Sequence, residues 1–511
     1  MSLREIARCM SVSKKWHHLI ESRALLWGNV DLGGSLGNSD LAPDGRPGMG
    51  LNYPEAANYN DNSDNSGNDQ GGNQDTDVIL LYDENLRTLA RRAGPAMWRI
   101  ALRFSPLISD AGIQALLDFG CINLRYLEIR ANRKISNDVF GELLARTCGR
   151  LEYVALSTTE ICDHVVQQLL ANAPNLVHLD LSFCRNITAD AFPVANEANF
   201  VFPSTAEPIS SFLEISSPVD SASSNQHPAF QVDANALPRL KTLLLDGCVE
   251  VYNAVTSRVL GAFGETLCTL DLCRTKVTMW VIHQIASVQH KPLRLERLLL
   301  NGISTRINDQ EQEDMLLNDW LGISLPILER FVEAVPNLTQ LRLGGGNALV
   351  TNGLVNAVAQ SCRKLASLDV HDSLRLGTQA MLALGEFCVN LTQLNISGCI
   401  GCFDEAVIGL ANGCMEIEAL DLSTLNITDE SLYVIGSRLY KLKHLFLDFC
   451  RQITADGIRG VVESTDGSGC LFTLRKLSFI QCRKVNYNVV DWCKERLHPD
   501  AVIMYEFSQR R

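Results

Sequence analysis

A repeated six-residue frame constrains this chain more than any other feature. The frame is a leucine, two residues, a second leucine, one residue and a third leucine, with occasional apolar substitutes. Nine of its twelve intervals span 25 to 28 residues, and a fixed period of about 20–50 residues is typical of stacked repeats. The frame starts at Met97, Leu124, Leu151, Leu176, Leu240, Leu267, Leu295, Leu338, Leu365, Leu391, Ile417, Leu442 and Leu474.

Each repeat changes its hydrophobic period partway along. Alternation such as Leu445-Phe446-Leu447 predicts a short strand, whereas apolar residues at helical spacing in residues 380–388 predict a following helix. One strand and one helix cannot bury their apolar faces alone, so the repeats must stack side by side. Because helices are wider than strands, the sequence predicts an α/β solenoid, a curved horseshoe with a concave parallel sheet and outer helices.

The residues after the strands carry a family resemblance. Cys184, Cys248, Cys399, Cys450 and Cys482 occupy one repeat position, and Ile-Thr follows three residues after Cys184 and Cys450 in the pattern C-x-x-[IL]-[ST]. Residues 97–490 therefore resemble the cysteine-containing subclass of leucine-rich repeats, which are about 26 residues long. Three repeats depart from the pattern and are expected to be locally irregular. They have Asn132 or Thr159 in place of the cysteine, or Gly344-Gly345-Gly346 after the strand.

Two stretches carry almost all of the net charge. Of the formal charge of −13, residues 33–78 hold −7 and residues 193–237 hold −5, so the remainder is close to neutral. The second stretch lies in the 64-residue interval from Leu176 to Leu240 and is rich in serine. Both compositions predict disordered acidic loops, and the neutral remainder gives no basic stripe for nucleic acid.

Cysteine usage and hydropathy suggest a compartment. Seventeen cysteines in a chain of this size without a signal peptide predict a reduced, intracellular location, cytoplasmic and/or nuclear. No run approaches about 18 uninterrupted apolar residues, so no membrane span is expected.

The N-terminal residues carry a second resemblance. Residues 3–20 are predicted to form two short amphipathic helices, and residues 27–32 an opening strand. Val12-x-x-x-Trp16 and the pair Leu26-Trp27 resemble the second two-thirds of an F-box, without its first helix and Leu-Pro-x-Glu opening. Either the sequence begins at an internal methionine, or part of the module was lost and the rest was kept as a repeat cap. Trp16 and Trp27 would form a hydrophobic cap in both cases.

The F-box resemblance implies partners. It implies that the N-terminal helices bind a Skp-type adaptor and, through it, a cullin-RING ubiquitin ligase. The residues expected to contact the adaptor are Leu3, Ile6, Val12 and Trp16.

These features predict a linear domain order, capped at the C-terminus by a helix containing Val489, Val490 and Trp492 and a strand within 502–507. The order is partial F-box-like helices and a first cap strand (1–32), an acidic disordered loop (33–78), repeats (79–192), an acidic serine-rich disordered insertion (193–237), repeats (238–490) and a C-terminal cap (491–511).

No catalytic or metal pattern stands out. Cys399-Ile400-Gly401-Cys402 has no second C-x-x-C to complete a four-ligand site, so packing as a small buried hydrophobe is the favoured interpretation. Gly344-Gly345-Gly346 lacks the Gly-Lys-[Ser/Thr] of a phosphate loop. We therefore predict a non-catalytic recognition protein with no catalytic residues, no metal and no cofactor.

Recognition is expected on the concave strand face, where exposed aromatics lie beside charges. The predicted function is substrate recognition for a Skp–cullin–F-box ubiquitin ligase, and the alternative is an adaptor-independent interaction scaffold in signalling or cell-cycle control. A structural alternative is that Asp180, Asp271, Asp369 and Asp421 fill a Leu-Asp-Leu consensus, and that phenylalanines before the cysteine pack into adjoining loops. The candidate substrate-binding residues are Phe104, Tyr126, Arg130, Tyr153, Phe183, His444, Phe446 and Phe449.

Overall fold

The computed structural model describes residues 29–31, 82–103, 105–194, 237–288, 292–303, 325–346, 350–463 and 470–506. It divides into two compact units, one ending at Ile135 and the other beginning at Ser136. The predicted F-box-like helices and the predicted loop at 33–78 lie outside the described residues, as does most of the predicted insertion at 193–237.

The first unit contains the expected strand–helix alternation. Strands β1 (Asn29–Asp31), β2 (Arg99–Arg103) and β3 (Tyr126–Arg130) pair in parallel in that order. Helices α3 (Asp83–Ala93) and α4 (Asp110–Asp118) pack against each other, with the single turn η2 (Gly94–Ala96) after α3. The opening strand predicted within residues 27–32 is confirmed by β1.

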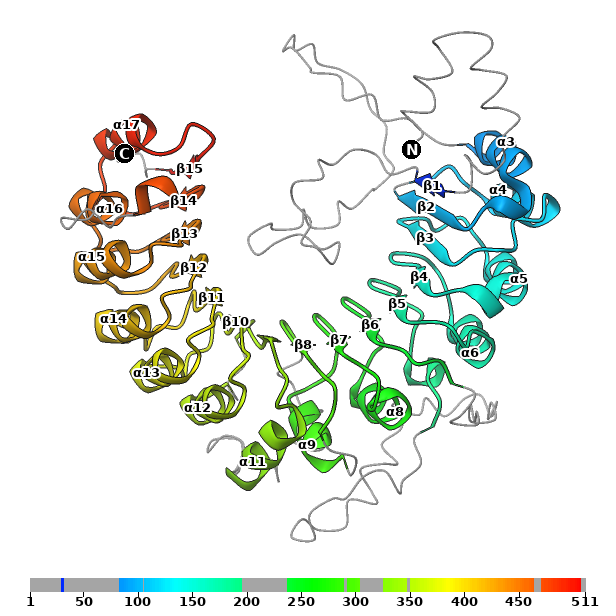
Figure 1. Ribbon diagram of the computed structural model, residues 1–511, viewed down its shortest axis with the longest axis horizontal. Helices are drawn as coiled ribbons and strands as arrows, with labels where there is room; N and C mark the ends of the chain where they lie inside the picture. Colours follow the sequence, from blue (N-terminus) through cyan, green and yellow to red (C-terminus); the bar gives the residue numbers. More distant parts are fainter. Residues whose placement is uncertain are drawn as a thin grey trace, which may run out of the picture. The chain divides into compact units, whose positions relative to one another are not determined.

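The second unit repeats this arrangement. Each strand pairs in parallel with the next, from β4 to β15, and the strands line the inner side of a curved array with the helices outside (Figure 1). The strands are β4 (Tyr153–Ala155), β5 (His178–Asp180), β6 (Thr242–Leu244), β7 (Thr269–Asp271), β8 (Arg297–Leu299), β9 (Gln340–Arg342), β10 (Ser367–Asp369), β11 (Gln393–Asn395), β12 (Ala419–Asp421), β13 (His444–Phe446), β14 (Lys476–Ser478) and β15 (Val502–Met504).

The helices follow the strands at the predicted spacing, and the last helix and strand confirm the predicted C-terminal elements. Among the described residues, no helix is long and apolar enough to span a membrane. The helices of the second unit are α5 (Asn137–Thr147), α6 (Asp163–Asn172), α8 (Asn253–Phe263), α9 (Trp280–Ser287), α11 (Leu325–Ala334), α12 (Asn352–Ser361), α13 (Thr378–Phe387), α14 (Asp404–Gly413), α15 (Asp429–Arg438), α16 (Ala455–Val462) and α17 (Asn488–Arg496), with the short turns η3 (Cys148–Arg150), η4 (Ala189–Ala191) and η6 (Cys470–Phe472).

A row of leucines forms the core behind the strands. The central residue of most three-residue strands is a buried leucine, and its register partner on the next strand is again a leucine, as for Leu394, Leu420 and Leu445. Each such burial stabilises the fold by about 1.5–3 kcal/mol. The residues on either side of each leucine face away from this core.

The thiols of the repeat cysteines form hydrogen bonds to the preceding repeat. The Sγ atoms of Cys184, Cys399 and Cys450 lie 3.0, 3.2 and 3.3 Å from the carbonyl oxygens of the residues that directly follow the preceding strands, Leu156, Val370 and Leu422. In the first unit Asn132 occupies the cysteine position and also forms hydrogen bonds to the preceding repeat. Its Nδ2 donates to the carbonyls of Ser105 and Ile108 at 2.8 and 2.9 Å. An amide therefore replaces the thiol without loss of the strand-to-loop bond.

A left-handed residue precedes each cysteine position. Phe183, Asp372 and Phe449 have φ of 60°, 58° and 60°, a conformation that costs a residue with a side chain about 1–2 kcal/mol. The backbone N–H of each donates to a carbonyl of the following repeat, at 2.6 Å for Phe183 and 2.8 Å for Phe449. The stacked neighbours thus hold the turn and fix where its side chain points.

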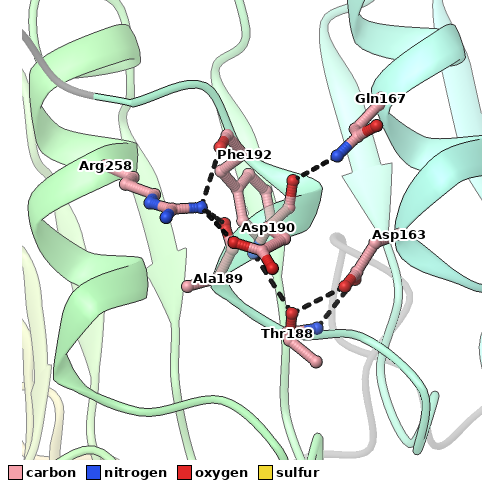
Figure 2. Close-up of polar contacts among 7 residues, drawn as sticks. All are labelled: Asp163, Gln167, Thr188, Ala189, Asp190, Phe192 and Arg258. Carbon is pink, nitrogen blue, oxygen red and sulfur yellow. Dashed lines mark hydrogen bonds and ion pairs between the residues drawn. The ribbon is translucent and has the colours of Figure 1, made fainter. Parts of the chain in front are cut away.

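Hydrogen bonds also connect the start of one helix to the start of the helix in the next repeat. Asp163, at the start of α6, accepts the N–H of Thr188 at 2.8 Å and its hydroxyl at 2.6 Å (Figure 2). Nη1 of Arg258 on α8 donates to the Ala189 carbonyl at 2.6 Å and forms an ion pair with Asp190 at 2.9 Å. The turn at η4 is therefore bonded on both sides at the point where the predicted insertion begins.

Candidate recognition surface

The acidic residues of the Leu-Asp-Leu positions serve the backbone. Carboxylate oxygens of Asp180, Asp271 and Asp421 each accept the N–H of the residue two positions later at 3.0 Å. Asp369 accepts the corresponding N–H of His371 at 3.3 Å. These contacts agree with the structural alternative, in which the aspartates fill the repeat consensus, and they show that each aspartate stabilises the turn after its strand.

The Tyr153 ring stacks on the ring of His178. Tyr153 is the register partner of His178 on the adjacent strand, and the two rings stack with centroids 4.1 Å apart and planes within 2°. Both residues are half-buried. Tyr153 is thus on the strand face as predicted, but much of its ring is already covered.

Phe183 packs into the adjoining loop. Its ring lies against Gly247, where an added Cβ would overlap it, and the Arg274 guanidinium lies 4.8 Å from the ring centroid. Arg274 in turn donates to Asp246 at 2.8 Å. The sequence alternative for phenylalanines before the cysteine therefore describes Phe183 better than an exposed anchor does.

The strands β13 to β15 present a different surface. Phe449 is 52% exposed, Phe446 is half-buried, and the Lys476 ammonium lies 5.0 Å from the Phe446 ring centroid. On β15, Val502 and Met504 are 54% and 36% exposed. We call these five residues the C-terminal strand face. Val502 and Met504 were not among the predicted binding residues, although they alternate with Ile503 in the predicted last strand.

His444 belongs to the same strand as Phe446 and is half-buried. Burial, followed by the positive charges of Lys476 and Lys443, holds its pKa below the ordinary value. His444 is therefore a neutral ring at pH 7.

Tyr126 and Arg130 come together around a buried carboxylate in the first unit. Glu128 is 1% exposed, and its oxygens accept Nε and Nη2 of Arg103 at 2.8 and 2.9 Å and the Tyr126 hydroxyl at 2.8 Å. Nε of Arg130 lies 2.7 Å from the same carboxylate, and the Arg99 guanidinium lies 4.2 Å from the Tyr126 ring centroid. We call these five residues the arginine face.

Burial alone would raise the pKa of Glu128. The hydrogen bond from Arg103 and the charges of Arg130 and Arg103 outweigh it, so the pKa lies below the ordinary value. Glu128 alternates with Tyr126 and Arg130 in the sequence, which puts the three on one strand face, but no sequence pattern indicates that Glu128 organises the cluster.

A histidine–aspartate pair lies in the middle of the second unit. Nδ1 of His371 lies 2.7 Å from Asp369, and Nδ2 of Asn301 donates to the same carboxylate at 2.6 Å. The hydrogen bond with Asp369 raises the pKa of His371. An added Cβ on Gly344 would overlap the His371 ring, which explains why glycine follows the strand there.

The two cysteines of the C-x-x-C sequence are buried, and several other candidates lie outside the described residues. Cys399 and Cys402 are fully buried, and burial raises the pKa values of their thiols to about 12 and about 11. In the part of the chain that the structure describes, no three metal-ligating side chains gather. Leu3, Ile6, Val12, Trp16 and Phe104 lie outside the described residues, so their predicted roles stay predictions.

Comparisons with known proteins give partial matches. No family model matches the chain. It is 29% identical over 175 residues to F-box/LRR-repeat protein 17 of Arabidopsis thaliana, which covers 32% of this chain and only 28% of that relative.

Two solved structures resemble the chain at 15% identity and a TM-score of 0.42. Rad7 in its yeast complex with Elc1 aligns over 83% of this chain and 77% of the matched chain, and an internalin of Listeria monocytogenes over 73% and 89%. The stacked strand–helix units, the leucine row and the cysteine bonds give this protein a leucine-rich-repeat fold.

Proposed function

We propose that this protein is the substrate-recognition subunit of a Skp–cullin–F-box ubiquitin ligase, which binds a protein substrate for ubiquitin-dependent degradation. The observation that carries the proposal is the order of the two sequence features. An F-box-like segment with Val12, Trp16 and Leu26-Trp27 precedes leucine-rich repeats, and a relative with partial similarity bears both names.

In this proposal the two features divide the work. The F-box-like helices bind the adaptor, and the strand faces of the repeats bind the substrate in the cytoplasm or nucleus. Ubiquitin transfer takes place on other subunits of the ligase. The fixed turns favour such binding, because side chains held by stacked neighbours lose little entropy when a partner docks.

The test is capture of a purified Skp-type adaptor by the tagged full chain. We expect stoichiometric capture, loss of capture in the double variant Val12→Asp, Trp16→Ala, and normal capture by Phe449→Ala, which alters only the strand face. If neither this chain nor a version extended upstream to any in-frame Leu-Pro-x-Glu helix binds the adaptor, the ligase role is wrong. Partner binding without adaptor capture would support the interaction scaffold instead.

A further inference from the structure

Two neighbouring loops near the C-terminal end of the second unit carry exposed cations. A buried cysteine and a buried apolar residue three positions later anchor each loop, and the two residues between them are exposed. The anchors are Cys450 and Ile453 in the first loop, and Cys482 and Val485 in the second. The exposed residues are Arg451 and Gln452 in the first loop, and Arg483 and Lys484 in the second.

Hydrogen bonds stack the two loops on each other. The N–H of Phe449 donates to the Ile480 carbonyl at 2.8 Å, and Nζ of Lys484 donates to Oε1 of Gln452 at 2.6 Å. The strands that lead into the loops, β13 and β14, pair in parallel (Figure 1). The backbones at residues 451 and 483, which lie between the two bonds, are therefore neighbours at about the 4.8 Å spacing of paired strands.

The cations of these loops have no acidic partner in the part of the chain that the structure describes. The guanidinium groups of Arg451 and Arg483 form no ion pair or hydrogen bond there, and Lys484 bonds to the neutral amide of Gln452. Lys443 differs, because it pairs with Glu418 at 2.8 Å. The two arginines and Lys484 thus keep their charge open to solvent.

Positive charge also dominates the surroundings. Residues 442–454 and 474–487 together contain six lysines and arginines but only one acidic residue, Asp448. Its carboxylate accepts the Ser478 hydroxyl at 2.5 Å and the Ile480 N–H at 2.8 Å, so it is bonded within the sheet. Glu506 lies beside the second loop, since its carbonyl accepts the N–H of Gln481 at 2.8 Å. Even with both carboxylates counted, this surface is basic in a chain of formal charge −13.

An apolar anchor lies in the first loop. Phe449, two residues before Arg451, is 52% exposed, and Phe446 of the same repeat has the Lys476 ammonium 5.0 Å from its ring centroid. The left-handed turn at Phe449 is held by its bond to the next repeat, so its backbone is already fixed before a partner docks. An exposed aromatic ring beside cations is a typical binding anchor.

We propose that Phe449, Arg451, Arg483 and Lys484 bind an acidic segment of a partner protein that carries an apolar side chain among its carboxylates. Carboxylates match the two guanidinium forks, and an apolar side chain covers the Phe449 ring. A nucleic acid is a poorer match, because its backbone needs a longer basic track, and residues 424–427 of the preceding repeat are uncharged. The inference rests on the proposed function in taking the repeats as the substrate-binding part.

Fluorescence anisotropy of the full chain tests this binding at about 0.15 M salt. The probe is a pool of fluorescein-labelled undecapeptides with leucine at the centre, two glutamates on each side of it, and glycine, alanine or serine elsewhere. A second pool has glutamine for each glutamate, and a third has serine for the leucine.

We expect the glutamate pool to bind at least about tenfold more tightly than the glutamine pool, and several-fold more tightly than the serine pool. The net charge of −13 repels acidic peptides overall, so this preference requires a local basic surface. The difference between the first two pools should narrow at about 0.5 M salt, which screens exposed charges.

Variants assign the binding to the loops. Arg451→Gln and Arg483→Gln should each weaken binding of the glutamate pool by about threefold, and the double variant by about tenfold, with little change for the glutamine pool. Phe449→Ser should weaken binding of both pools, because it removes the apolar contact.

The matched control is Arg185→Gln. Arg185 is exposed and follows Phe183-Cys184 as Arg451 follows Phe449-Cys450, but the ring of Phe183 packs on Gly247. The corresponding residue of the next repeat is the uncharged Val249. Arg185→Gln should therefore leave binding of the glutamate pool unchanged.

Three results would overturn the inference. They are equal binding of the glutamate and glutamine pools by the folded chain, equal effects of Arg185→Gln and Arg451→Gln, or tighter binding of a single-stranded RNA oligonucleotide through the same arginines. Urea unfolding midpoints of the variants separate lost binding from lost folding. Adaptor capture measured on the same preparations keeps the two proposals apart, because either can fail while the other holds.

Discussion

Replacing the Glu128 carboxylate with an amide should loosen β2 and β3. In Glu128→Gln the shape stays, but the buried negative charge is lost, and an NH2 group faces either Arg103 or Tyr126, both of which now donate to the carboxylate. Removing one partner of a buried ion pair typically costs 3–5 kcal/mol. Because Arg103 and Arg130 are about one-third exposed and water can screen them, we expect the lower end, about 3 kcal/mol.

Hydrogen exchange of the full chain measures this locally. A loss of about 3 kcal/mol predicts backbone exchange roughly a hundredfold faster in peptides covering 99–103 and 126–130. The matched control is Glu142→Gln on α5, an exposed partner of Arg146, which should change exchange there by less than about threefold.

The effect should depend on pH with a definite sign. The pKa of Glu128 in the folded protein lies below its ordinary value, so the stabilisation is present above the unfolded pKa of about 4.3. It is lost as the pH falls through the folded value, where the wild-type carboxyl also becomes protonated. Wild type and Glu128→Gln should therefore differ fully at pH 6 and converge well below pH 4. Exchange within about threefold of wild type at pH 6 would refute the reasoning.

Three further predictions concern the second unit. Asp429→Ala removes two carboxylate bonds to Thr454, at 2.7 and 2.6 Å, and should lower the free energy of unfolding by about 2–3 kcal/mol in urea titrations, whereas the exposed Asp456→Ala should cost under about 1 kcal/mol. Native Cys399 and Cys402 should resist iodoacetamide at pH 8 and react only after unfolding, as read by mass spectrometry, because burial raises their thiol pKa values to about 12 and about 11. Phe449→Ser should leave the unfolding midpoint nearly unchanged yet weaken capture of a partner that docks on the C-terminal strand face, and normal capture would remove Phe449 from the candidate anchors.

The repeat fold was predictable because period and burial are encoded locally. Alternation around Leu445 and the helical spacing before Cys388 each follow from a few neighbouring residues, and stacking is then required to bury both faces. What local patterns do not contain is the identity of the side chain that arrives from the next repeat.

Phe183 and Phe449 show this limit. They occupy the same position in nearly identical sequences and share φ of 60°, so the chain alone gives no reason to separate them. The structure separates them by their neighbours. The next repeat offers Phe183 a glycine, Gly247, on which the ring can lie, whereas the corresponding residue after Phe449 is Gln481, which has a side chain and φ of 58°. The Phe183 ring therefore packs against the next repeat, whereas Phe449 stays 52% exposed.

This difference suggests how one repeat design yields separate recognition surfaces. The leucine row, the cysteine bonds and the left-handed turns fix the backbone in nearly every repeat, so variation at the facing positions changes chemistry without changing shape. Exposed Phe449 and Val502 give the C-terminal strand face an apolar character, whereas Glu128 with its arginines gives the first unit a polar one. Because each surface is built from adjacent repeats of its own unit, we expect substitutions at one surface to leave binding at the other unchanged.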